Sequence, residues 1–180
     1  MLFSRTRRAE REVAERIYCA ALAAARRPHF YLKCGVPDTL QGRFEMVALS
    51  LFPVLHRLMR DPGDGPELAR LVAESFVDDM DGALRDVGVS DTRVPKRMKT
   101  LYGSFAGRIA AYGRALEEGE AALREAIARN VFPDGADDAH ARSLALYLQA
   151  AVREARSADL VAIRECLVPF PELEAMGEGE

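Results

Sequence analysis

Three aspartates occupy four consecutive positions of the chain, as Asp78, Asp79 and Asp81. Carboxylate oxygens are ligands that Mg²⁺ prefers, and all-helical prenyl-transferring enzymes use aspartate-rich sequences of this kind to hold magnesium against a diphosphate. On a helix, Asp78 and Asp81 would share a face. That chemistry also needs a second aspartate-rich helix with basic diphosphate ligands. Asp137-Asp138 is a weak partner, because it stands where a helix would begin and where the helix dipole alone favours acids.

A surface role explains the same aspartates more simply. Asp81 and Arg85 are four residues apart, and an exposed helical ion pair at this spacing contributes a few tenths of a kcal/mol. We therefore predict no metal ligands and no cofactor. The alternative is a helical magnesium-dependent enzyme acting on an isoprenoid or quinone-like substrate. The alternative requires Asp78 and Asp81 to point into a deep pocket beside other carboxylates, whereas the surface role directs them outward to water.

Other residues that commonly carry catalysis lack the required spacing. His29, His56 and His140 are far apart and form no HxxxH-type pair. The chain has no nucleophile elbow, no paired base and no glycine-rich phosphate loop. The sequence therefore predicts a protein that is not an enzyme.

The aspartates belong to a pair of predicted helices between Phe76 and Tyr112. Apolar residues keep helical spacing up to Gly88, where the first helix should end. A short turn-rich connection follows, and Pro95 suits the first turn of the second helix because its missing N–H costs nothing there. The second helix begins with basic residues and then carries an apolar-aromatic stripe. The stripe consists of Leu101, Tyr102, Phe105, Ile109, Tyr112 and Leu116.

Two glycines one helical turn apart, Gly103 and Gly107, stand beside this stripe. Glycine costs about 1 kcal/mol relative to alanine inside a helix. We therefore predict that another backbone or a ligand approaches the helix closely at this point.

Two extended motifs of the chain resemble a known family. The first runs from Tyr31 to Glu45 and reads YLKCGVPDTLQGRFE. The second runs from Asp78 to Tyr112 and reads DDMDGALRDVGVSDTRVPKRMKTLYGSFAGRIAAY. Together, in this order, they resemble the ubiquinol-cytochrome c chaperone family over roughly Phe30 to Leu116. The resemblance implies a non-enzymatic assembly chaperone that binds newly made cytochrome b and promotes assembly of ubiquinol-cytochrome c reductase, respiratory complex III.

We assign client binding to charged and phenolic side chains that stand beside apolar positions. Such a combination suits the holding of an amphipathic or transmembrane-type peptide before insertion. Taken singly, each aromatic residue is more often part of a core than of a binding groove. The predicted client-binding residues are Tyr31, Asp38, Arg43, Asp79, Arg85, Tyr102, Arg108 and Tyr112.

The size and charge of the chain limit the number of domains and the kinds of partner. With 180 residues, 49% of them hydrophobic, the chain has the length of one domain with a real core. A net charge of −3 argues against a DNA-binding protein. The N-terminal segment is nevertheless rich in arginine, and together with Met1-Leu2-Phe3 it would suit contact with the ribosome or an anionic membrane surface. The competing interpretation is a solvated helix end. The arginines are Arg5, Arg7, Arg8, Arg11, Arg16, Arg26 and Arg27.

Cysteine usage and hydropathy predict the compartment. Cys19, Cys34 and Cys166 are odd in number and scattered, which fits a reducing environment. The chain has no run of about 18 apolar residues and no secretory signal. We therefore expect a bacterial protein of the cytoplasm, peripheral to the inner membrane.

The remaining patterns predict helices in the first half of the chain. Ser4 should cap a helix that runs to about Arg27, and residues 29–36 should form an extended loop. Asp38 or Thr39 should cap a highly apolar, central helix, with Gln41 completing a capping box. Pro53 should kink that helix, and the breaker cluster at residues 61–66 should form a loop.

The second half should continue in the same way. The helix with the apolar-aromatic stripe should extend toward Arg129, with a bend or a split at Gly113 or Gly119. A further helix should run from about Asp137 to Arg156, and a short one from a Ser157 cap to near Pro169. Because no alternating strand pattern appears, we predict an all-α, single-domain, irregular bundle of about five to seven helices over residues 1–170. Residues 171–180 should form an acidic, disordered tail.

Overall fold

The computed structural model describes residues 2–86, 94–135, 137–167 and 170–171, and every regular element among them is an α-helix. The predicted all-α class is therefore confirmed. Six helices have twelve or more residues, and α2 and α8 have five each. The helices are α1 (Leu2–Ala25), α2 (Pro28–Leu32), α3 (Leu40–Leu58), α4 (Gly65–Asp86), α5 (Val94–Glu118), α6 (Glu120–Val131), α7 (Asp138–Ser157) and α8 (Leu160–Arg164).

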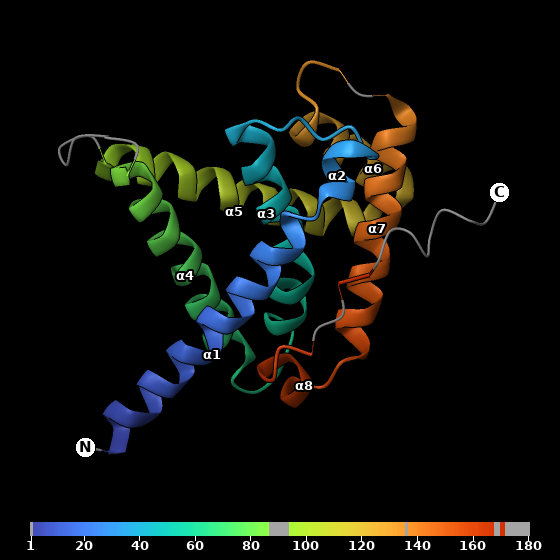
Figure 1. Cartoon of the computed structure of the whole chain (residues 1–180). Helices are drawn as coiled ribbons and strands as arrows, with labels where there is room; N and C mark the ends of the chain where they lie inside the picture. The colour runs from blue at the N-terminus through green and yellow to red at the C-terminus, as the bar shows by residue number, and fades with distance from the viewer. Residues whose placement is uncertain (1, 87–93, 136, 168–169, 172–180) are drawn as a thin grey trace.

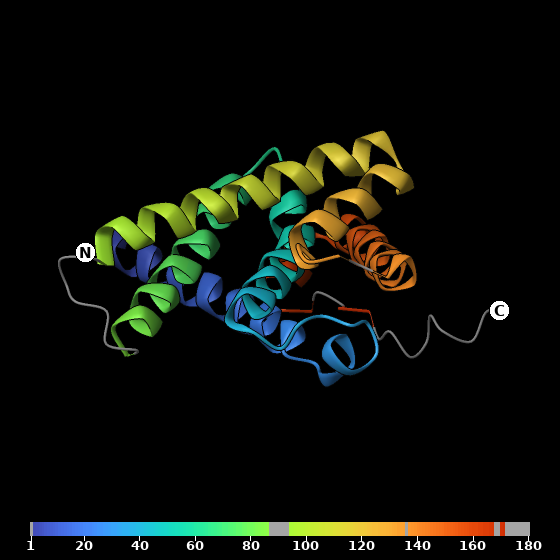
Figure 2. The ribbon, with the colours of Figure 1, turned by 90° about the horizontal axis from the view of Figure 1, so that it is seen from above.

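Helix α3 is the centre of the bundle, as its apolar sequence predicts. It contacts α1, α4, α5, α6 and α7, and a helix that is apolar around most of its circumference has to be covered on most sides. Nearly every residue from Glu45 to Leu58 is buried. The helix continues through Pro53. Figures 1 and 2 show α5 running along one side of the bundle, past α4, α3 and α6, while the N-terminal end of α1 projects away from it.

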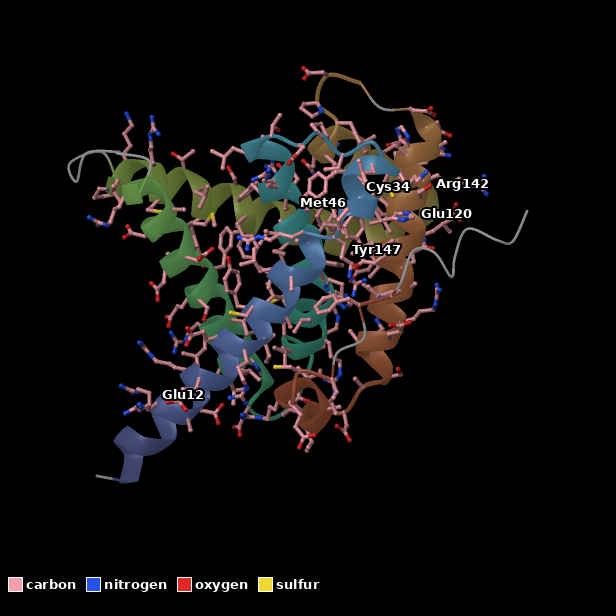
Figure 3. All side chains as sticks on the ribbon, in the orientation of Figure 1. Glu12, Cys34, Met46, Glu120, Arg142 and Tyr147 are labelled. Carbon is pink, nitrogen blue, oxygen red and sulfur yellow. The ribbon has the colours of Figure 1, made fainter. Side chains whose placement is uncertain are left out.

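A continuous hydrophobic core joins the helices. Met46 on α3 and Tyr147 on α7 are completely buried, and Cys34, just after α2, is almost so. Figure 3 shows these side chains inside the bundle, whereas Glu12 lies on the outside of α1. Phe30 packs edge-to-face on Tyr147, with ring centroids 5.0 Å apart, so that α2 is fixed on α7.

The segment predicted as a loop at residues 29–36 begins with a helix instead. Pro28 occupies the first turn of α2, where its fixed φ and missing N–H favour a helix start. The buried Phe30 ring and a hydrogen bond from the Tyr31 hydroxyl to the Ala25 carbonyl, 3.0 Å, hold this short helix in place. Helix α1 also differs from its prediction, because it begins at Leu2 and not after a cap at Ser4.

Of the two predicted caps, Asp38 and Thr39, it is Thr39 that caps α3. Its hydroxyl accepts a hydrogen bond from the backbone N–H of Gly42 at 3.1 Å. The predicted capping box is wrong, since Gln41 donates to Glu45 at 2.6 Å and does not turn back to the helix start. Gly42 is buried, and a Cβ at this position would clash with the carbonyl oxygen of Pro37.

Glycine divides the long predicted helix at one of the two expected points. Gly119 has φ +116°, which side chains other than glycine rarely tolerate, and it separates α5 from α6. Gly113 remains inside α5. Asp137 caps α7 close to the predicted start. Ser157 is the last residue of α7 and not a cap, and Asp159 caps α8 by accepting from the Ala162 N–H at 2.7 Å.

Two predictions lie on residues outside the described ranges. The end of a helix at Gly88 falls between α4 and α5, and the acidic tail falls almost entirely beyond residue 171. The division into a domain of residues 1–170 and a tail therefore stays a prediction.

Candidate functional site

A buried ion pair joins the centre of the bundle to its long outer helix. Arg108 on α5 donates hydrogen bonds to both carboxylate oxygens of Glu45 on α3, at 2.7–3.1 Å. Glu45 is fully buried, whereas the Arg108 side chain retains 24% exposure. Gln41 adds a hydrogen bond to the same carboxylate, and the Arg108 guanidinium lies 6.0 Å from the Phe44 ring centroid. The hydrogen bonds to Glu45 raise the pKa of Arg108 above its ordinary value.

Tyr112, one turn further along α5, belongs to the core. It has no exposed surface, and its ring packs edge-to-face on Phe52 with centroids 5.8 Å apart. Burial raises the pKa of its phenol well above the ordinary value, so the group stays neutral. Helices α3 and α6 cover the face of α5 that carries Tyr112, so this side chain is not on the surface, and its predicted contact with a client stays a prediction.

Tyr31, Asp38 and Arg43 form a second group around the start of α3. Asp38 and Arg43 make an exposed ion pair at 2.7 Å, and the hydrogen bond from Arg43 lowers the pKa of Asp38. Tyr31 is half-buried, and its hydroxyl is engaged by the Ala25 carbonyl. Burial raises the pKa of the Tyr31 phenol, and the charges of Arg43 and Asp38 act on it in opposite directions. The two charged residues are open to solvent beside a neutral aromatic surface.

Asp79 lies at a cavity between α1 and α4. The Tyr18 hydroxyl, on α1, donates to Asp79 at 2.7 Å. The cavity has a volume of about 370 Å³, and Asp78, Glu15 and Glu74 also line it. Burial and the bond to Asp79 raise the pKa of Tyr18 far above its ordinary value, so this phenol remains a donor.

Arg85 and Tyr102 are the two remaining predicted residues. Arg85 makes the predicted ion pair with Asp81 at 2.7 Å on the exposed end of α4. Tyr102 is 51% exposed, and the neighbouring Gly103 and Gly107 face open space, with no atom within 4 Å of an added Cβ. Within the described residues no backbone approaches these glycines, so the predicted close contact inside the protein is wrong.

The eight predicted residues therefore do not form one continuous surface. Those at the start of α3 are neighbours, and those on α4 and α5 are distributed along two helices. Sequence reasoning missed Glu45 and Tyr18, which hold Arg108 and Asp79. A signal for Glu45 existed, because a carboxylate within the most apolar helix needs a cationic partner.

The two aspartates of the magnesium alternative, Asp78 and Asp81, have different surroundings. Asp78 lines the cavity between α1 and α4, but Asp81 points to its partner Arg85, so the two aspartates do not share a site. Over the described part of the chain, no three His, Cys, Asp or Glu side chains converge as a set of metal ligands. Among the described helices, none combines the length and apolar character needed to cross a bilayer.

Comparison with known proteins first defines the class of fold. The crystal structure of the Cbp3 homolog from Brucella abortus superimposes with a TM-score of 0.84 at 36% sequence identity, covering 96% of each chain. The sequence profile described as "Ubiquinol-cytochrome C chaperone" matches residues 32–166. The chain therefore belongs to the ubiquinol-cytochrome c chaperone family. The match extends beyond the motifs in the first half of the chain and includes α6, α7 and α8.

More distant relatives are vertebrate proteins. The chain is 23% identical over 125 residues, 69% of its length, to the ubiquinol-cytochrome-c reductase complex assembly factor 1 of Xenopus laevis. The chain is also 23% identical, again over 69% of its own length, to the protein of that name in Mus musculus. The match spans 62% of the Xenopus protein and 42% of the mouse protein.

Proposed function

We propose that the protein is a non-enzymatic assembly chaperone that binds newly made cytochrome b and promotes assembly of ubiquinol-cytochrome c reductase. The observation that carries the proposal is family membership over residues 32–166, together with the fold shared with the Brucella abortus homolog. The vertebrate relatives are assembly factors for the same reductase by name. The separation of Asp78 from Asp81 supports binding over magnesium chemistry.

The exposed face of α5 supports a role in holding a helical client. Tyr102 offers a half-exposed aromatic ring, and Gly103 and Gly107 leave the helix backbone accessible. Small residues at this spacing allow the backbone of an apolar helix to approach closely. Asp38, Arg43, Asp79 and Arg85 would contribute polar contacts at the ends of such a client.

Arg108 and Tyr112 have a supporting role in this proposal. Arg108 connects α5 to Glu45 on α3, and Tyr112 anchors the same helix in the core. Both residues therefore hold α5 against the bundle while its outer face stays available.

The projecting end of α1 supports a position at the cytoplasmic face of the inner membrane. Figure 1 shows this end of α1 extending away from the other helices, and Arg7, Arg8 and Arg11 in this half of the helix are exposed. Exposed arginines on a helix attract anionic lipid headgroups or ribosomal RNA. Acidic neighbours offset part of this charge, as in the Arg8–Glu12 pair at 3.0 Å, so the attraction would be modest.

A gene deletion tests the proposed function. We expect the deletion strain to lose assembled complex III and b-type haem absorbance in membrane difference spectra, while the a-type haem signal of the terminal oxidase persists as a control. Re-expression of the full chain should restore the b-type signal. Unchanged cytochrome b absorbance in the deletion strain would contradict the proposal.

A further inference from the structure

The last described residues of the chain return to the end of α1. Arg27, which immediately precedes α2, donates hydrogen bonds from Nη1 to two main-chain carbonyl oxygens, at 3.0 Å to Phe170 and at 2.8 Å to Pro171. Phe170 also packs against the hydrophobic core. Figures 1 and 2 show this short red piece of the chain beside α7. One arginine thus holds two peptide carbonyls that lie 143 and 144 positions away in sequence.

Two buried polar atoms of α7 near Arg27 are without a hydrogen bond. Within the described residues, neither the Tyr147 hydroxyl nor Oε2 of Glu154 has a partner, and the Tyr147 side chain has no exposed surface. The two residues are seven positions apart and therefore share a face of the helix. Burial raises the pKa of Tyr147 to about 12, and the charges of Arg27 and Glu154 shift it in opposite directions, so both charges lie near the phenol.

These two atoms are unfavourable as they stand. A buried polar group that makes no hydrogen bond has lost its contact with water without compensation, and native proteins keep few such groups. The phenol is able to donate and the carboxylate oxygen to accept. We call Arg27, Tyr147 and Glu154 together the Arg27 site. Phe170 and Pro171 engage only its guanidinium, so they are an incomplete occupant of the site.

We propose that the Arg27 site binds an extended segment of the client, which displaces Phe170 and Pro171 and places its carbonyls on Arg27 and its other polar groups on Tyr147 and Glu154. The inference rests on the proposed function. A newly made polypeptide that has not yet folded exposes main-chain carbonyls and aromatic side chains together. These are the groups with which Phe170 and Pro171 hold the site in this structure.

The internal occupant makes the site selective. A tethered segment competes with an external one at an effective concentration on the order of millimolar. The apparent affinity of an external segment is reduced accordingly, because the binding-competent state is only fractionally populated. A segment that also bonds to Tyr147 and Glu154 offsets this loss, whereas a peptide that reaches only Arg27 does not.

Peptide binding by the full chain tests the exchange. The probe is a fluorescein-labelled, amidated peptide LVPFPELE, which has the sequence of residues 167–174. In fluorescence anisotropy, Phe170→Ala should bind the probe at least about fivefold more tightly than the parent chain, because the internal competitor is weakened. Adding Arg27→Gln to Phe170→Ala should weaken binding at least about tenfold, because the ligand carbonyls lose their donor. Adding Arg153→Gln, which removes an exposed charge of α7, should leave it unchanged.

Circular dichroism establishes that each variant is folded. Among folded variants, the proposal is overturned if Phe170→Ala does not improve probe binding or if Arg27→Gln does not weaken it. If Phe170→Ala does not fold, Tyr147→Phe decides the question by itself.

Tyr147→Phe separates a client site from a purely structural contact. The removed hydroxyl has no partner among the described residues, so the melting temperature should hold or rise. In the deletion strain, this variant should nevertheless restore less than half of the b-type haem signal that Arg153→Gln restores, because the client segment loses a donor. If both restore it equally, the proposal for the Arg27 site fails and the chaperone function stands. If the deletion itself leaves complex III unchanged, the proposed function fails, whatever the peptide result.

Discussion

Arg108 and Glu45, 63 positions apart in sequence, form a hydrogen-bonded ion pair in which the carboxylate has no exposure to solvent. The pair fastens α5 to the central helix α3. A buried charge is tolerated only with a close partner, because its desolvation otherwise costs several kcal/mol. Removal of either Arg108 or Glu45 alone should therefore destabilise the bundle strongly.

We predict that Arg108→Met lowers the free energy of unfolding by about 3–5 kcal/mol, since it leaves the Glu45 carboxylate buried without its cation. The double variant Glu45→Met with Arg108→Met should recover most of the loss. Urea unfolding monitored by circular dichroism measures both. Arg114→Met, at an exposed position of α5, is the matched control and should change stability by less than about 0.5 kcal/mol. Additive losses in the double variant would contradict the coupling.

His56 should make the protein sensitive to acid. Burial, followed by the charges of Arg60 and Arg156, lowers its pKa to about 4. Above the unfolded pKa of about 6.5 the imidazole is neutral in both states. As the pH falls from about 6.5 to about 4, His56 becomes protonated in the unfolded chain but stays neutral in the folded chain. The free energy of unfolding therefore falls by up to about 3 kcal/mol.

The substitution His56→Leu removes this titration. We expect the difference in unfolding free energy between pH 7 and pH 4.5 to be smaller in the variant than in the parent chain. Urea midpoints at the two pH values measure it. Identical pH dependence in both proteins would show that His56 does not contribute to acid sensitivity.

Gly42 and Gly103 should respond to alanine in opposite directions. Gly42 is buried against the Pro37 carbonyl, so the methyl group of Gly42→Ala would push the start of α3 away from Pro37. The free energy of unfolding should fall by at least about 1–3 kcal/mol. At Gly103 an added methyl group meets nothing, so Gly103→Ala should stabilise the helix by about 0.5–1 kcal/mol. Thermal unfolding of the two variants under identical conditions tests both signs.

The larger substitution Gly107→Leu tests whether the open face of α5 is kept for a client. Stability should hold or rise, because no neighbour occupies the space. If a client helix packs there, the variant should fail to restore b-type haem absorbance in the deletion strain. A stable variant that complements fully would remove this face of α5 from the proposed contact surface.

Magnesium should have no effect on thermal stability. Asp78 and Asp81 point to different surroundings, and Asp81 is held by Arg85. A tightly bound ion at a hundredfold excess over Kd would raise stability by about 2.7 kcal/mol. A magnesium-dependent rise in melting temperature that disappears in Asp78→Asn with Asp81→Asn would instead favour the enzyme alternative.

The sequence by itself determined the helical class and most helix positions. Periodic apolar residues, the Pro95 start and the Gly119 break are local signals, since they act through backbone geometry within a few residues. The apolar character of α3 also predicted its central place. The motifs were sufficient to predict the family, which the profile match confirms.

Local signals did not determine the role of each side chain. Tyr102 and Tyr112 belong to the same predicted stripe, yet one is half-exposed and the other fully buried, because neighbouring helices cover only part of α5. Periodicity shows which residues share a face, but not which elements cover that face. The partners of Glu45 and Asp79 lie 63 and 61 positions away, so only the packing of α5 on α3 and of α1 on α4 could decide them.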